Sequence, residues 1–466
     1  MNKYIKLIKE ETGASKDYIY KELTVSNTNI LLVFNEVLTS NDDIGEFILK
    51  ELVLLSKKQL KKIEDNLPAC NIKDITKEEM TTYLNKGFLV IIINDKILSV
   101  EVKKSLERGV TTIESELSLT GPKDSFSENF NTNLGLIRRR IKSNNLWWNE
   151  INLGTKTETK MGLIYMNDIV DKKLINDIEK KLKSINIDGI IDSSYLKDKL
   201  ESDNLFPTVI LTERPDKVSM ALLEGKAVIL VDMSSYAIIL PNFFVDYFHT
   251  VDDYYQKSFN TTFIRIVRMF AFFIAIFVPA YYIAITTYNQ DSCFLSLLLL
   301  LKAQRASVPF PATIEALFMI LSFEVLRESD LRMSSTTGSA ISILGGLILG
   351  DAAVSAGIMS PIMIIVIAIS SIASFVFTSI ELINAIRIYR IIFILIASIL
   401  GIYGIYLGAV YLLFKLITLA PFNKPYLAPF SPFIKKEQKD AIIKTKNEGK
   451  KYRNVLLTTN KRRGEY

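Results

Sequence analysis

The chain has 466 residues, of which 49% are apolar and 23% are charged, and its net charge is +6. This length predicts more than one domain, and the pairing of apolar with charged residues favours two chemically different halves. The composition includes one histidine, His249, and two cysteines. These counts exclude a disulfide scaffold, a cysteine-rich zinc site and a multi-histidine metal centre. The mild net charge gives no indication of nucleic-acid binding.

The N-terminal half predicts two tandem small α/β subdomains. No apolar run begins the chain, so we expect no secretory signal and a cytoplasmic N-terminus. Two segments repeat the order strand, helix, helix, strand pair, with continuous buried runs. The subdomains are expected over residues 1–115 and 155–245, with a basic connector over 116–154. The repeated stretches are Ile30–Asn35 with Ile44–Leu52, Tyr83–Ile93 with Ile97–Val100, Gly162–Asn167 with Asp171–Leu182, and Leu222–Val231 with Tyr236–Leu240.

Long apolar runs begin near residue 260 and predict a polytopic α-helical transmembrane domain over residues 246–420. Runs of about 20 apolar residues can cross a bilayer. Cys293–Leu301 is too short to span and predicts a re-entrant or interfacial piece. Pro311–Glu328 carries several charges and predicts a helix at the interface or inside the protein. We expect four spanning helices, at Phe263–Thr286, Ser339–Gly357, Pro361–Thr378 and Ile388–Leu419.

The charges give the expected orientation. Arg265 and Arg268 lie in the first turns of the first span, where long basic side chains can extend to lipid headgroups. An even number of spans returns the C-terminus to the cytosolic side, which agrees with the basic tail over residues 421–466. This count places Arg387 and Arg390 outside, unless the middle runs form a hairpin that does not fully cross. The tail is interpreted as a disordered topology signal, with anionic lipid binding as the alternative.

One expected span is rich in small residues and holds the candidate pore or gate. Small side chains permit tight helix packing, and they also leave room for a water-filled path when several copies surround an axis. Asp351 lies inside this run, where a carboxylate is costly unless it faces a wet or internal surface. A structural pair with a neighbouring arginine, or a place near the membrane surface, would also explain Asp351. The candidates are Ser339, Ser342, Gly346, Leu347, Gly350, Asp351 and Ala353.

A second candidate is a group of charged residues near the membrane. If these side chains are buried they require pairing, whereas a solvated interfacial face requires none. The group comprises Arg305, Glu315, Glu324, Arg327 and Glu328.

No residue pattern predicts an enzyme. His249 has no partner in register and is interpreted as a structural residue near the membrane. Glu224-Gly225-Lys226 resembles the end of a phosphate loop, but the upstream glycine and the magnesium-binding Ser or Thr are missing. We therefore expect no catalytic residues, no cofactor and no metal.

Several long motifs resemble the A subunit of bacterial spore germinant receptors, the GerA type. The resemblance covers about residues 30–435, and Val308-Pro309-Phe310-Pro311 followed by Ile314-Glu315-Ala316 is its most specific part. The other matching stretches are Gly121–Phe126, Leu136–Ile141, Ile187–Ser193, Thr212–Asp216, Leu223–Lys226, Ile229–Asp232, Asp253–Tyr255, Arg265–Arg268, Phe323–Glu328, Ala352–Val354, Ser360-Pro361, Asn384–Arg387 and Pro425–Pro429.

The resemblance implies a multi-pass subunit of the spore inner membrane, with both termini facing the cytoplasm or spore core. It also implies a nutrient-gated monovalent-cation channel, built as a homo-oligomeric, pentamer-like ring. Its expected partners are a transporter-like B subunit, which binds the nutrient, and a lipoprotein C subunit. A related accessory germination channel is an alternative within the same family.

Two alternatives come from other classes. A secondary transporter would contain inverted repeats and broken helices at matched positions, and Cys293–Leu301 has no matching partner. A scaffold would only dock partners through its soluble half. If the small-residue span lines the pore, a bulkier or charged residue at Ser342 or Leu347 is expected to alter conductance or gating.

Overall fold

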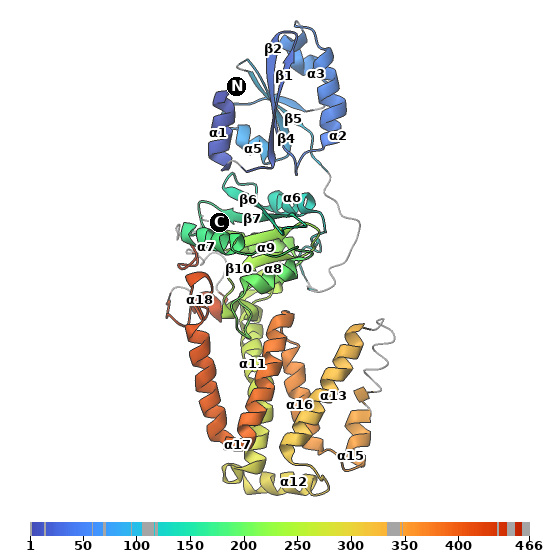
Figure 1. The fold of residues 1–466 in the computed structure, drawn as a ribbon, viewed down its shortest axis with the longest axis vertical. Helices are drawn as coiled ribbons and strands as arrows, with labels where there is room; N and C mark the ends of the chain where they lie inside the picture. Colours follow the sequence, from blue (N-terminus) through green and yellow to red (C-terminus); the bar gives the residue numbers. More distant parts are fainter. Residues whose placement is uncertain are drawn as a thin grey trace.

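The protein is described by a computed structural model that covers residues 2–13, 15–57, 59–68, 71–94, 96–104, 116, 120–332, 345–346, 348–435, 438–444 and 453–458. Figure 1 shows two α/β subdomains in line above a helical half, so the soluble part and the apolar part are spatially separate. The end of the helical half that is remote from the soluble subdomains is called the far end below.

The first subdomain is a five-stranded antiparallel sheet with the order β1-β2-β4-β5-β3. Successive residues of β2 alternate between two apolar clusters, because neighbouring side chains of a strand point to opposite faces. Both faces are covered by helices, which explains the continuous apolar runs in the sequence. The strands are β1 Tyr18–Val25, β2 Thr28–Asn35, β3 Ile72–Asp74, β4 Phe88–Ile93 and β5 Lys96–Glu101, and the helices are α1 Asn2–Thr12, α2 Asn41–Asp43, η1 Ile44–Leu49, α3 Lys50–Leu54, η2 Gln59–Lys62, α4 Ile63–Asn66 and α5 Met80–Leu84.

The second subdomain repeats this topology, with the order β6-β7-β9-β10-β8, and the predicted duplication is confirmed. The structure differs from the expected connector over 116–154, because α6 and β6 belong to the second subdomain. The strands are β6 Leu146–Leu153, β7 Thr159–Met166, β8 Ile210–Thr212, β9 Ala227–Val231 and β10 Ala237–Leu240, and the helices are α6 Phe130–Arg140, α7 Lys172–Lys183, α8 Ser193–Leu200 and α9 Pro215–Leu223.

A buried ion pair joins the two subdomains. Arg138 of α6 lies with its Nε 2.7 Å from Oδ2 of Asp17, and both side chains are almost fully buried. The indole Nε1 of Trp148 donates to Oδ1 of the same carboxylate at 2.9 Å. One acidic side chain before β1 therefore links the first subdomain to a helix and a strand of the second.

The helical half begins with the short elements η3 Phe244–Phe248 and α10 Asp252–Tyr255 and continues with α11 Ser258–Thr287, which contains the predicted first span. Within the described residues, α11 and α17 are the two helices long and apolar enough to cross a membrane. In Figure 1, α12 lies across the far end, as expected for an interfacial piece. The remaining elements are η4 Gln290–Ser292, α12 Leu295–Arg305, α13 Ala312–Arg332, η5 Ile348–Ala352, α15 Ala353–Ser355, α16 Pro361–Ser374, α17 Ile380–Thr418, η6 Pro421–Asn423 and α18 Gln438–Ala441.

Helix α13 differs from the expected interfacial helix. It has 21 residues, which corresponds to about 31 Å, and it contacts α11, α16 and α17. In Figure 1 it stands beside α16 rather than across the end of the bundle. Its charged residues are accommodated by specific partners, so they do not force it to lie at a surface.

The last apolar run, predicted as one span, is a helical hairpin. Gly401 interrupts α17 with φ +60° and ψ −142°, and Figure 1 shows the two arms diverging from the far end. Asn289 stabilises the turn, because its Oδ1 accepts the N–H of Ile402 at 3.0 Å. Glycine is required here, since this backbone region is essentially closed to residues with a Cβ.

The hairpin reverses the expected position of Arg387 and Arg390. The first arm of α17 begins beside the soluble half, where Glu381 lies 2.9 Å from Lys197 of α8. Arg387 and Arg390 follow within the next turns and therefore lie toward the cytosolic side if the soluble half is cytosolic. The structure therefore places both arginines at the end of the bundle beside the soluble half, which differs from the expected outer location because the last apolar run forms two arms instead of a single crossing.

The described part of the C-terminal tail is folded against the protein, which differs from the expected disordered signal. Leu457 is 0% exposed, and Thr458 forms an antiparallel bridge with Val170 of the second subdomain. Apolar side chains between the basic residues make this packing possible. The tail therefore returns to the soluble half, in agreement with the expected common side for both ends of the helical half.

Replacing Gly401 with Ala should destabilise the helical half by about 1–3 kcal/mol, because the strained backbone would carry a Cβ. That Cβ would also lie 2.4 Å from Oδ1 of Asn289. The thermal unfolding midpoint of the detergent-purified chain measures the effect. Gly45→Ala is the matched control, since a Cβ at Gly45 meets nothing within 4 Å. Equal midpoints for the two variants would contradict the assigned role of Gly401.

Candidate functional site

The predicted charged group near the membrane is divided between the two ends of α13. Glu315 lies in the first turn of this helix, whereas Glu324, Arg327 and Glu328 lie near its other end. Glu328 follows Glu315 by 13 positions in the sequence, which corresponds to about 20 Å along a helix. Their nearness in sequence predicts a single group, whereas the structure separates them into two sites.

Glu315 is the most deeply buried acidic side chain of this set, with 1% of its surface exposed. Its Oε1 accepts hydrogen bonds from the backbone N–H of Ser360 at 2.6 Å and from the Ser360 hydroxyl at 2.5 Å. Ser360 is the N-cap of α16, so the carboxylate also faces the positive end of that helix dipole. Glu315 therefore ties the start of α13 to the start of α16.

Arg305 partly neutralises Glu315 at the far end. Its Nε lies 3.8 Å from Oε2 of Glu315, and neither atom makes a hydrogen bond within the described residues. The Tyr282 hydroxyl is likewise buried without a partner there. Buried polar groups of this kind are costly to leave unsatisfied, so this is a polar site inside an otherwise apolar bundle.

The other end of α13 carries separate, partly exposed contacts. Oε1 of Glu324 lies 3.1 Å from Nε of Arg387 on α17. The Arg327 guanidinium lies over the Phe375 ring, 5.5 Å from its centre. Glu328 pairs along the helix with Arg332, and both side chains are exposed. Glu324 is therefore paired with an arginine of a neighbouring helix, as expected for a buried charge. Glu328 lies on an exposed face, as expected for the solvated alternative.

The described part of the candidate pore segment runs beside α13. A Cβ on Gly345 would lie 2.3 Å from Cδ2 of Leu326, and one on Gly357 would lie 3.4 Å from the Ser307 carbonyl. Gly345 therefore packs tightly within the chain. By contrast, a Cβ at Gly346 or Gly350 would meet nothing within 4 Å. Small residues in this segment therefore differ in their surroundings: Gly345 packs against α13, whereas Gly346 and Gly350 have no close neighbour among the described residues.

Asp351 is exposed beside these open glycines, and Ala353 is half-buried. No ion pair with Asp351 occurs among the residues that the structure describes. The expected alternative, a pair with an arginine of a neighbouring helix, is thus not observed in that part of the chain. Ser339, Ser342 and Leu347 lie outside the described residues.

A third site, which the sequence analysis missed, joins the soluble half to α11 and is called the junction. Asp253 of α10 lies with Oδ2 3.0 Å from Nε of Arg265 and 2.9 Å from Nη1 of Arg268. Arg265 is 1% exposed and Arg268 is 7% exposed. The expected extension of these arginines to lipid headgroups is wrong, because a buried carboxylate binds both of them.

The C-terminal tail completes the junction. Nη1 of Arg265 donates to the backbone carbonyl of Asp440 at 2.7 Å. Nζ of Lys444 donates to the backbone carbonyls of Asp253 and Gln256. Burial raises the pKa of Asp253, but Arg268 and Arg265 outweigh burial, so its pKa is lowered and the carboxylate stays ionised. Local spacing gave no signal for Lys444, which is far away in sequence.

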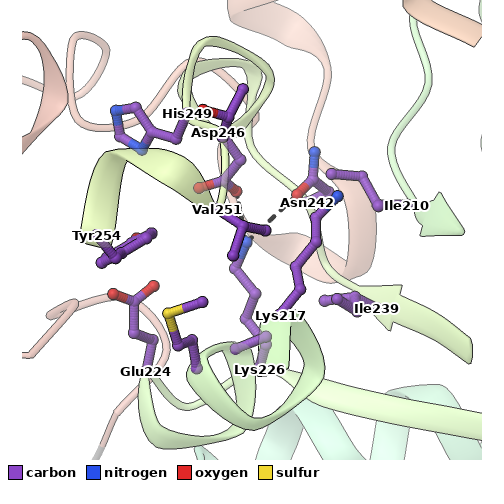
Figure 2. A pocket seen from close by; sticks show the side chains of 13 residues that line it. Ile210, Lys217, Glu224, Lys226, Ile239, Asn242, Asp246, His249, Val251 and Tyr254 are labelled. Atoms are coloured by element: carbon purple, nitrogen blue, oxygen red, sulfur yellow. Dashed lines mark hydrogen bonds and ion pairs between the residues drawn. The ribbon is translucent and has the colours of Figure 1, made fainter. Parts of the chain in front are cut away.

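A cavity of about 60 Å³ lies against the junction, between α9 and the segment after β10. Figure 2 shows Lys226 extending into it toward Asp246 and Asn242. Nζ of Lys226 lies 2.5 Å from Oδ2 of Asp246 and 3.3 Å from Oδ1 of Asn242. Glu224-Gly225-Lys226 is therefore a turn after α9, and its lysine binds side chains of the same chain. This explains its partial likeness to a phosphate loop.

His249 also borders this cavity and has the predicted structural role. Its Nε2 lies 2.8 Å from the backbone carbonyl of Ala441 in the tail. Burial lowers the pKa of His249, and the charge of Arg265 lowers it further, while Asp440 and Asp246 oppose this effect. Among the described residues, no group of three His, Cys, Asp or Glu side chains is placed as metal ligands would be.

Replacing Asp253 with Asn should cost about 3–5 kcal/mol, because two buried arginines would lose their shared counter-charge. Asp252→Asn is the matched control, since its Oδ1 only accepts from the Thr120 backbone and hydroxyl and an amide oxygen can replace it. Chemical denaturation of the purified chain measures both variants. Similar stabilities for the two would refute the importance of the junction.

The junction should also weaken in mild acid. The folded pKa of His249 lies below its ordinary value of 6.5, so the unfolded chain takes up the proton first as pH falls. The stability that comes from keeping His249 neutral is fully present above pH 6.5. It is lost as the pH falls from 6.5 through the lower folded pKa. His249→Gln should reduce the loss of stability between pH 7 and pH 5. An unchanged pH profile would count against this assignment.

Comparisons with known proteins agree with the architecture and the motifs. The family model described as "Bacillus/Clostridium GerA spore germination protein" matches residues 6–456. The chain is 35% identical over 449 residues to spore germination protein KA of Bacillus subtilis (strain 168), covering 94% of this chain and 82% of that protein. It is 34% identical over 437 residues to spore germination protein GerQA of Bacillus cereus, covering 92% of this chain and 87% of that protein.

A solved structure is also similar, namely the N-terminal domain of the A subunit of the Bacillus megaterium spore germinant receptor GerK3. It shares 28% identity with a TM-score of 0.41, covering 52% of this chain and 94% of that domain. The family match extends over nearly the whole chain, through both sheets, the helical half and the tail. The chain therefore belongs to the GerA family of spore germination proteins, the A subunits of spore germinant receptors.

Proposed function

We propose that this protein is a pore-forming A subunit, which assembles with copies of itself into a ring in the spore inner membrane and conducts monovalent cations. The ring would be gated by nutrient through a transporter-like B subunit and a lipoprotein C subunit, and ion release would start germination. The soluble half and both ends of the helical half would face the spore core.

The observation that carries this proposal is the uncovered face of the segment 345–355. Among the described residues, nothing lies within 4 Å of a Cβ placed on Gly346 or Gly350, and Asp351 is exposed beside them. A carboxylate in an apolar segment is stable at membrane depth only against water or a polar partner. Copies of this face around an axis would give Asp351 an aqueous lumen, and the small residues would leave that lumen open.

The junction supports the gating part of the proposal. The first helix of the bundle is bound through Asp253 to α10, and the Tyr255 hydroxyl of α10 donates to Oδ2 of Asp216 on α9 of the second subdomain at 3.1 Å. Helix α17 is bound to the same subdomain through the pair of Glu381 with Lys197. A movement of the soluble half would therefore be passed to two helices at once. This arrangement suits a gate that is controlled by partners bound outside the membrane segments.

The exposed surface of the helical half is compatible with both lipid and partner subunits. Large apolar side chains are exposed along the second arm of α17, among them Tyr403, Tyr406 and Phe414. The accessory germination channel of the same family would use the same pore, and it is distinguished by its failure to purify with B and C subunits.

Reconstitution in vesicles tests conduction. Vesicles loaded with KCl and containing the purified chain, alone or with its B and C subunits, should release K⁺ as measured with a K⁺-selective electrode. Unitary currents in planar bilayers distinguish a channel from a carrier, and flux at the level of empty vesicles in every combination would refute the proposal. The oligomeric state follows from the particle symmetry.

Variants of the open face should change this flux. Gly350→Leu should reduce K⁺ release, because a branched side chain would fill the lumen, and Asp351→Asn should reduce the preference for cations over anions because it removes the lumen charge. Ser398→Leu adds similar bulk elsewhere in the helical half, where the Ser398 hydroxyl only bonds to its own helix, and should conduct normally. Wild-type flux and selectivity in both open-face variants would exclude this segment from the ion path.

A further inference from the structure

Arg390 is a buried arginine that neither the family relationship nor the proposed ion path explains. Arg390 lies on the first arm of α17, ten residues from its start, which places it about 15 Å along the helix. It is 3% exposed. An arginine inside an apolar bundle is costly to bury, so its guanidinium must find other groups that compensate its charge.

The first compensating group is a carbonyl made available by a proline. In an α-helix, the carbonyl of Ala275 would accept the N–H of residue 279, but position 279 of α11 is Pro and has no N–H. Nε of Arg390 donates to this carbonyl at 2.8 Å. The side chain therefore satisfies a backbone oxygen that the proline has left without its helical partner, and it does so from a different helix.

The second group is the C-terminal end of α16. Nη2 of Arg390 donates to the Ser370 carbonyl at 3.1 Å, and Nη1 donates to the Ser371 hydroxyl at 3.3 Å. Both residues lie in the last turns of α16, where the helix dipole is negative and favours a cation. The planar fork of a guanidinium spreads five N–H donors over three nitrogens and so reaches acceptors on two helices at once, whereas the three donors of a lysine ammonium diverge from a single nitrogen.

No carboxylate forms a close ion pair with Arg390 among the described residues. The nearby carboxylate of Glu324 is bound by Arg387 instead, with 3.1 Å between Oε1 and Nε. Carbonyl dipoles and a hydroxyl therefore carry most of the local compensation for Arg390. The same turn of α17 thus holds two arginines with different tasks, which provides an internal control.

We propose that Arg390 is a positioning residue that clasps α11, α16 and the first arm of α17 by using the carbonyl that Pro279 frees. Arg390 and Pro279 then act as a pair: the proline creates the acceptor and the arginine occupies it. The clasp fixes α16, which follows directly after the segment 345–355, against the rest of the bundle. This inference does not depend on ion conduction and can be tested without it.

A double-mutant cycle in thermal unfolding tests the pair. Arg390→Met should lower the unfolding midpoint, because it leaves the Ala275 carbonyl and the end of α16 unsatisfied. Pro279→Ala supplies an N–H for the Ala275 carbonyl, so Arg390→Met should cost less in the Pro279→Ala background than in the natural chain. Arg387→Met is the control, since it breaks the Glu324 pair on the same helix and should cost the same in both backgrounds.

A labelling measurement separates positioning of α16 from general destabilisation. Met363 of α16 is fully buried, so a Met363→Cys variant, with Cys70 and Cys293 replaced by Ala, should resist a membrane-permeant thiol reagent. Arg390→Met should increase the labelling rate several-fold at temperatures well below unfolding, Pro279→Ala should partly reverse this increase, and Arg387→Met should leave the rate unchanged.

Equal costs of Arg390→Met in both backgrounds, or unchanged labelling in that variant, would overturn the proposal. If Arg390→Met does not fold, Arg390→Lys gives the same comparison, because an ammonium can retain only part of the clasp. The lysine variant should show a smaller loss that is again reduced by Pro279→Ala. A lysine variant as stable as the natural chain, with protected Met363→Cys, would also overturn the proposal.

Discussion

The structure depends most on the buried carboxylate of Asp253. It lies where the soluble half meets the helical half, and it balances two arginines of α11 that are themselves buried. Burying three charged groups is favourable only when their geometry is mutually satisfied, so this point fixes the direction in which α11 leaves the second subdomain. The tail adds Lys444 to the backbone of the same turn, so the start and the end of the helical half share one anchor.

The helical half repeats this solution with different partners. Glu315 is held by the N-cap of α16, Glu324 by Arg387, and Arg390 by backbone carbonyls. Each charged group connects two or more helices. Apolar helices alone could slide past one another, so these polar contacts determine how the helices are placed. Asp351 differs from them because it has no such connection in the described chain, and this contrast supports its proposed place on the ion path.

Much of the architecture could be predicted from the sequence. The duplicated strand and helix order follows from continuous apolar runs, and α11 follows from length and hydropathy. Helix α16 has 14 residues and ends before the predicted span over Pro361–Thr378 does. The edge strands β1 and β6 were missed because one face of each is polar, so they give no apolar run. The hairpin at Gly401 was missed because its signal is a single glycine within a long apolar stretch, and several other glycines flank it.

The sites were less accessible to sequence reasoning. Arg265 and Arg268 are spaced to share one helix face, and an acidic residue precedes them. This spacing is compatible with a shared ion pair, but two basic residues at the start of a predicted span are explained more simply by contact with lipid headgroups. Lys444 and Arg390 use backbone carbonyls from distant segments, and such partners leave no trace in residue identity. The candidate positions on the small-residue run could be named from the sequence. Which of them pack against another helix could be decided only from the position of α13.

The bridge between Thr458 and Val170 closes the chain on itself. The polypeptide leaves the second subdomain through α11, passes through the whole bundle and is fastened back to the same subdomain beside β7 and α7. Both ends of the bundle are therefore connected to that subdomain, so a rotation of the subdomain would act on the first helix and on the tail together. The first subdomain is fastened to the second by side chains instead, through Asp17 with Arg138, Lys16 with Glu150 and Asn144 with Thr81.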